Sequence, residues 1–193
     1  MTDANDARQP PDPGPGLSDR ERRTRIESAR AAVKDLLEEQ KTLRSVSAEL
    51  GTPLTFQAIE EAFAKRSTDD HVRVQLAALS WAAATCCNQL NVIMQAGSVL
   101  AGFRDPELPG EGPPSVTRDY SLLRDNGVIT QTQRQLLSDL NSARIALTHR
   151  YGQPTTPNEL YTAASLALKA LGTFGKDYRS WLTGLDIIPP AKR

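Results

Sequence analysis

The chain has 193 residues, a length typical of one domain that buries a single hydrophobic core. Its 23 Lys and Arg residues balance 23 Asp and Glu residues, so the formal net charge of +0 gives no global positive field of the kind that marks nucleic-acid-binding proteins. Any RNA contact must therefore come from a local patch. Aromatic residues make up only 5% of the chain, and its Ala- and Leu-rich composition favours helices over sheets.

Residues 1–17 are rich in Pro, Gly and Asp and have almost nothing to bury. We expect this segment to be a disordered tail ahead of one helical domain at 18–193. The tail has no apolar run of the kind that forms a signal peptide, and no stretch of the chain approaches the ~18 apolar residues of a membrane span. These features predict a cytoplasmic protein that does not contact a membrane.

The first predicted helix begins after Ser18, which stands three residues before Glu21 in a capping-box pattern. Apolar residues then recur at helical spacing as far as Gly51, with a break near Ser45 left open. A second, short helix is predicted next, with Thr52 as its N-cap and Pro53 at its first helical position.

The third predicted helix, from Asp69 to about Gly102, is apolar nearly all round. Such a helix is buried by its neighbours or by another subunit. It contains the only cysteines, Cys86 and Cys87, whose side chains point ~100° apart on a helix, so they form neither a disulfide framework nor a metal site. We predict that both are small core residues.

A Pro- and Gly-rich loop at 104–114 follows the third helix. A short helix is then predicted to end at Asn126 and Gly127, where a left-handed C-cap costs little. The next helix runs from about Thr130 into the 140s, with a stripe of leucines facing the core.

A last helix is predicted from Thr156, Pro157 and Glu159, which form another capping box with proline in the first turn, and its apolar stripe reaches toward Trp181. No alternating strand pattern competes anywhere in the chain. The sequence therefore predicts an all-α bundle of about five helices.

Most standard enzyme signatures are missing from the sequence: it has no glycine-rich phosphate loop, no zinc spacing of cysteines and no serine elbow. His71 follows Asp69 and Asp70, but carboxylates at a helix start also complement the helix dipole. We therefore expect His71 to be structural or solvated, and we expect no metal site and no cofactor.

The second of the two histidines stands in the stretch "SARIALTHRY", where Arg144 is followed by His149 and Tyr151. On a straight helix Arg144 and Tyr151 lie within ~20° of each other at the rim of the apolar stripe, whereas His149 lies ~140° from Arg144. Both side chains can serve one cleft only if the helix ends or tightens near Thr148, or if the cleft lies between two subunits. Otherwise Arg144 lies along the surface, His149 is solvated and Tyr151 packs at the helix end.

The segment from Leu122 to Gly152 resembles the end of the HEPN superfamily (higher eukaryotes and prokaryotes nucleotide-binding), in particular the toxin of HEPN/MNT toxin-antitoxin pairs. The resemblance covers about 35 residues. In that family a turn like "GVI" at 127–129 and a helix lead to an arginine, four residues, a histidine, any residue and a tyrosine. Arg144, His149 and Tyr151 stand at these positions.

The resemblance implies a metal-independent endoribonuclease toxin that cuts RNA through attack by the ribose 2′-hydroxyl. Arg144 and His149 would be its catalytic residues: His149 would handle the proton and Arg144 the phosphate charge. It also implies a homodimer with a composite site, and an MNT-type nucleotidyltransferase antitoxin that adenylylates Tyr151.

One position departs from the family pattern, because Ile145 stands where a polar residue usually follows the arginine. Two alternatives therefore stay open. In the first, the chain is a non-catalytic binding module with the HEPN fold. In the second, it is an unrelated helical interaction protein that recruits partners through its proline-rich tail.

Overall fold

The computed structural model describes residues 16–106, 115–148 and 154–190. These residues form seven helices and no strand, which confirms the all-α class and agrees roughly, but not exactly, with the predicted number of about five helices. Most of the predicted tail, as well as His149 and Tyr151, lies outside the described residues. The helices are α1 (Asp19–Leu50), α2 (Phe56–Lys65), α3 (Asp70–Leu100), α4 (Val116–Asp125), α5 (Gln131–Thr148), α6 (Pro157–Asp177) and α7 (Arg179–Gly184).

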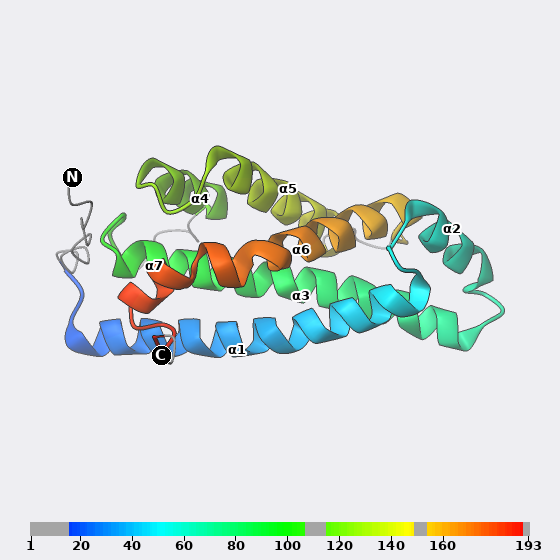
Figure 1. Ribbon diagram of the computed structural model, residues 1–193, viewed down its shortest axis with the longest axis horizontal. Helices are drawn as coiled ribbons and strands as arrows, with labels where there is room; N and C mark the ends of the chain where they lie inside the picture. Colours follow the sequence, from blue (N-terminus) through cyan, green and yellow to red (C-terminus); the bar gives the residue numbers. More distant parts are fainter. Residues whose placement is uncertain (1–15, 107–114, 149–153, 191–193) are drawn as a thin grey trace, which may run out of the picture.

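Two long helices set the shape of the molecule (Figure 1). α1 and α3 have 32 and 31 residues and run side by side along its long axis. At about 1.5 Å per residue each is roughly 48 Å long. α6 packs against α3 and also against α5, while α2 and α7 lie at opposite ends of the molecule. α1 is continuous through Ser45, so the break considered there does not occur.

Helix starts follow the sequence closely where a capping box is present. The backbone N–H of Glu21 donates to Ser18 Oγ (3.3 Å), and the Ser18 N–H donates to the Glu21 carboxylate (2.9 Å). Thr156 and Glu159 make the same reciprocal pair of bonds at the start of α6. Both predicted capping boxes are confirmed, because each satisfies backbone donors that a helix start leaves unpaired.

The predicted start of the second helix is wrong. The N-cap of α2 is Thr55, not Thr52, and Pro53 lies in the connection that precedes the helix. The Thr55 backbone is extended, and its hydroxyl accepts a hydrogen bond from the Ala58 N–H (3.2 Å). Two threonines three residues apart are both suitable caps, so composition alone could not choose between them.

The apolar third helix is buried by its neighbours within the chain. α1, α2, α4, α5 and α6 all contact α3. Two large side chains in its N-terminal half remain exposed, Val74 (63%) and Trp81 (69%). Although α3 is rich in apolar residues, none of the described helices combines the length and hydropathy that crossing a membrane requires.

The last predicted helix is divided into α6 and α7 at Tyr178, whose φ of −104° and ψ of −6° interrupt the regular helix. The turn brings the Trp181 ring onto α3 at Gly97. A Cβ atom at position 97 would overlap the indole ring, so this close approach requires glycine.

A buried ion pair connects the segment after α3 to α4. Arg104 Nε donates to Asp119 Oδ1 at 2.7 Å, and the two side chains are 8% and 1% exposed. Since charges are rarely buried without a partner, this pair fixes how α4 sits on the core.

Candidate catalytic site at the end of α5

Arg144 lies in the last turn and a half of α5 and is half-buried rather than extended along the surface. α5 is described as far as Thr148, and the next residue that the structure describes is Pro154. His149 and Tyr151 fall in that gap, so their positions relative to Arg144 stay predictions. The core stripe of α5 is as expected, because Leu137 and Leu140 are fully buried.

The Arg144 side chain joins a polar network that we call the Asn91 network, made by Asn91, Tyr120, Asn141 and Arg144. Arg144 Nη2 donates to Asn141 Oδ1 (3.3 Å), and Asn91 Nδ2 donates to the same oxygen (3.1 Å). The Tyr120 hydroxyl donates to Asn91 Oδ1. α3, α4 and α5 thus meet through hydrogen-bonded side chains in a region otherwise packed with apolar groups.

One donor of the Arg144 guanidinium is unused. Its Nε atom is buried and has no hydrogen-bond partner among the residues that the structure describes. Buried polar atoms are almost always hydrogen-bonded, so this unpaired donor is an exception among the described residues. The planar guanidinium fork suits the oxygens of a phosphate.

Asn141 is the residue of this site that the sequence did not single out. It stands three residues before Arg144, a spacing that places the two side chains on neighbouring turns of one helix face. Ile145, the departure from the family pattern, is 44% exposed. The polar contact that orients the arginine therefore comes from Asn141, three residues before it in the chain, and that spacing was the signal available in the sequence.

Both cysteines lie in the core, as predicted, and carry free thiols. Burial raises the pKa of Cys86 to about 12, and the nearby Glu39 carboxylate adds to this effect. Burial also raises the pKa of Cys87 to about 11, while the neighbouring Arg144 guanidinium acts in the opposite direction. Cys87 thus forms part of the apolar wall beside Arg144, and at neutral pH its thiol is protonated.

Both thiols are expected to be unreactive in the folded protein, because reaction requires an accessible thiolate. Ellman's reagent at pH 8 should label neither thiol in native protein and both after unfolding in guanidinium chloride. Since the folded pKa values exceed the ordinary value of 9.0, the stability that the protonated thiols contribute is complete below about pH 9 and is lost as the pH rises through 11 to 12. Fast labelling of native protein would contradict this prediction.

The control is a Cys86→Ala/Cys87→Ala double variant. Its free energy of unfolding should fall less than that of the wild type between pH 8 and pH 11, because it lacks the two titrating groups. An equal fall in both proteins would show that other groups cause the pH dependence.

The predicted helix-start role of the carboxylates before His71 is supported. Asp69 Oδ1 accepts hydrogen bonds from the backbone N–H groups of His71 (2.9 Å) and Val72 (3.2 Å), and Asp70 pairs with Arg73 (2.9 Å). His71 itself is exposed. Within residues 16–106, 115–148 and 154–190, no group of three or more His, Cys, Asp or Glu side chains lies close enough together to hold a metal ion.

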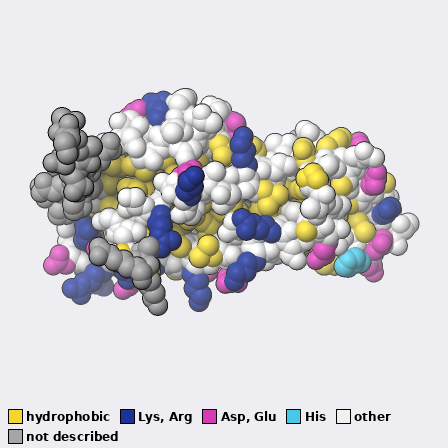
Figure 2. Space-filling model, viewed as in Figure 1, with side chains coloured by type: hydrophobic (Ala, Val, Ile, Leu, Met, Phe, Trp, Pro, Cys, Tyr) yellow, Lys and Arg dark blue, Asp and Glu magenta, His cyan; other side chains and the backbone are white. Residues whose placement is uncertain are grey.

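Charge is distributed without a dominant sign on the face that Figure 2 shows. Lys and Arg side chains are spread among acidic and apolar ones and do not form one continuous basic stripe. This mixed distribution agrees with the balanced composition of the chain. Any contact with RNA would therefore depend on individual arginines. Comparison of the chain with models of protein families, with curated proteins and with solved structures finds no match.

Proposed function

We propose that the protein is a metal-independent endoribonuclease of the HEPN type, acting as the toxin of a toxin-antitoxin pair. The observation that carries the proposal is the Arg144 guanidinium, which is oriented by Asn141 and keeps a buried Nε without a partner among the described residues. The motif that brings His149 five residues and Tyr151 seven residues after it supplies the other groups.

The chemistry needs a proton acceptor and a counter-charge. The ribose 2′-oxygen loses its proton to His149 and attacks the adjacent phosphorus, which closes a 2′,3′-cyclic phosphate. The bond to the 5′-oxygen breaks, and that oxygen leaves with the proton that His149 had accepted. Arg144 offsets the negative charge that builds up on the phosphate oxygens during the attack. Histidine suits the proton transfers because its ordinary pKa is near neutrality.

The partners follow from the same proposal. Two copies of the chain form one composite site, which brings a second Arg144 and His149 to the RNA and removes the need for both residues of one helix to face one cleft. An MNT-type nucleotidyltransferase adds adenylate to the Tyr151 hydroxyl. Adenylate there places bulk and negative charge two residues from His149, which excludes the substrate phosphate.

The test is RNA cleavage by purified full-length protein in EDTA. The wild type should cut single-stranded RNA, and His149→Ala should cut at least about a hundredfold more slowly, since general acid-base catalysis contributes about 10²- to 10⁴-fold. His71→Ala is the matched control, because the other histidine is exposed on α3 and should leave the rate unchanged. Cleavage that stops in EDTA, or that survives in His149→Ala, overturns the proposal.

A second candidate function is a non-catalytic HEPN-fold binding module. The favouring observation is that Arg144 already bonds within its own helix and contacts the buried Asn91 network, which gives it a structural role without any substrate. Under this alternative the wild type cuts no RNA, and Arg144→Ala lowers the free energy of unfolding by more than a solvated arginine would.

A further inference from the structure

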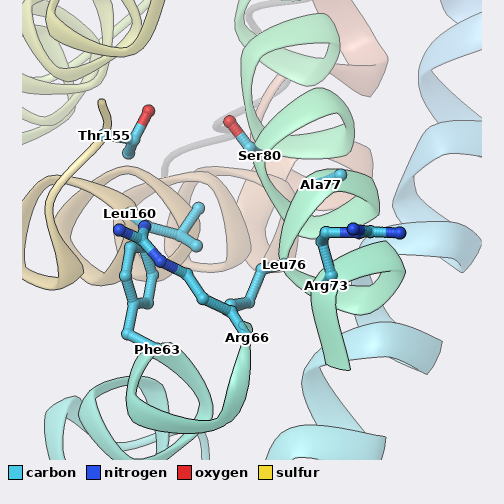
Figure 3. Close-up of a pocket in the computed structure, with 8 residues that line it drawn as sticks. All are labelled: Phe63, Arg66, Arg73, Leu76, Ala77, Ser80, Thr155 and Leu160. Atoms are coloured by element: carbon cyan, nitrogen blue, oxygen red, sulfur yellow. The ribbon is translucent and has the colours of Figure 1, made fainter. Parts of the chain in front are cut away.

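A second feature that can bind a ligand lies at the α2 end of the molecule. A pocket of about 270 Å³ opens where the end of α2, the first half of α3 and the start of α6 meet (Figure 3). Its apolar wall is formed by Phe63, Leu76 and Leu160. The pocket is slightly smaller than the ~300 Å³ at which sites for drug-sized ligands begin, so its occupant is small.

Arg66 is the principal cation of the pocket. It is the C-cap residue of α2, and its guanidinium carbon lies 4.9 Å from the centre of the Phe63 ring. The guanidinium thus rests on the ring while its N–H groups make no hydrogen bond or ion pair within the described part of the chain. Stacking fixes the plane of the fork and leaves its donors free.

Two hydroxyl groups complete the polar side of the pocket. Ser80 on α3 and Thr155 just before α6 face the open space from opposite elements (Figure 3). Neither hydroxyl hydrogen-bonds to a described residue. Both can donate to an oxygen acceptor, and together with the Arg66 fork they present donors from three separate segments of the chain.

The lining also selects the sign of the ligand charge. It contains two arginines, Arg66 and Arg73, and no Asp or Glu. Arg73 is already paired with Asp70 and its side chain points away from Arg66, so it contributes positive field at the rim rather than a second fork (Figure 3). The pocket therefore combines an apolar wall with one free guanidinium and two free hydroxyls, which favours an amphipathic anion.

We propose that this pocket binds a small phosphate monoester whose other end is planar and apolar. The three phosphate oxygens accept from Arg66, Ser80 and Thr155, while the planar group lies against Leu76 and Leu160. A phosphate monoester brings three oxygens and nearly two negative charges to these donors, whereas a carboxylate brings two oxygens and one charge, and a free phosphate leaves the apolar wall in water. Arg144 is not among the residues that line this pocket, so the site does not depend on the proposed RNA cleavage.

The test is isothermal titration calorimetry of the full-length protein with phenyl phosphate, inorganic phosphate, benzoate and phenol as probes. Phenyl phosphate should bind one per chain and at least about tenfold more tightly than each of the other three. Arg66→Met keeps the side-chain length and removes the charge, and it should weaken binding by about ten- to a hundredfold, the loss of a charge-assisted hydrogen-bonded contact.

Arg44→Met is the matched control, because Arg44 is exposed on α1 and does not line the pocket, and it should bind like the wild type. Thr155→Val provides a second variant that removes only a hydroxyl and should weaken phenyl phosphate binding several-fold while leaving phenol binding unchanged. The proposal is overturned if phenyl phosphate gives no heat at millimolar concentration, if benzoate or phenol binds equally well, or if Arg66→Met binds like the wild type.

Discussion

Replacing Arg144 with alanine is expected to lower the rate of RNA cleavage by about a hundred- to a thousandfold. The guanidinium is held by Asn141 with its Nε free, so no other described group of α5 offers the same donors at that position. Loss of a single donor that stabilises developing charge typically costs this factor. Arg144→Lys should not restore the rate, because an ammonium group cannot make the two parallel hydrogen bonds of a guanidinium.

Single-turnover cleavage of a labelled RNA measures this loss, with thermal unfolding as the check on folding. Arg134→Ala is the matched control: Arg134 lies on the same helix, is also half-buried and donates through Nε to Ser121 Oγ (3.2 Å). The cleavage rate of Asn141→Ala should lie between the rates of Arg144→Ala and Arg134→Ala, because this substitution removes the contact that orients the guanidinium but keeps the guanidinium itself. Equal rates for Arg144→Ala and Arg134→Ala would refute a catalytic role for Arg144.

Replacing Asp119 with alanine is expected to lower the free energy of unfolding by about 3 to 5 kcal/mol, the usual cost of breaking a buried ion pair. The Arg104 guanidinium bonds to Asp119 at 2.7 Å, and both side chains are almost wholly shielded from water. Removing the carboxylate deprives the Arg104 guanidinium of this 2.7 Å partner in a region shielded from water. Urea unfolding at pH 7 would measure the loss.

The chain provides an internal comparison for this ion pair. Lys41 and Glu38 form a pair of similar length, 2.9 Å, but their side chains are 71% and 64% exposed. Glu38→Ala should therefore cost less than about 1 kcal/mol. If Asp119→Ala costs no more than Glu38→Ala, burial does not determine the strength of these pairs in this protein.

Local signals in the sequence predicted the helices well. The capping residues Ser18 and Thr156, and the Asn126–Gly127 stop after α4, each mark a helix end through bonds between near neighbours. The start of α2 was misplaced because Thr52 and Thr55 carry the same local signal. The break at Tyr178 was missed because it depends on how the end of the chain packs on α3, and no residue there is a strong helix breaker.

The surroundings of Arg144 could be predicted from the sequence only in part. Arg144 was recognised by its spacing to His149 and Tyr151, but the sequence placed it only at the rim of α5. The Asn91 network joins Asn141 to Asn91, 50 positions earlier in the chain, and no local pattern encodes such a contact. The Arg66 pocket combines α2, α3 and α6 in the same way, so only the packed helices bring its donors together.

The contact between Gly97 and Trp181 has a consequence for the history of the sequence. The indole occupies the volume that any side chain at position 97 would need, so the two positions are constrained jointly rather than one at a time. A descendant of this chain could acquire alanine or a larger residue at 97 only together with a smaller residue at 181. Substitutions at positions 97 and 181 are therefore expected to covary. Such covariation across related sequences would indicate that α7 packs on α3 in them as well.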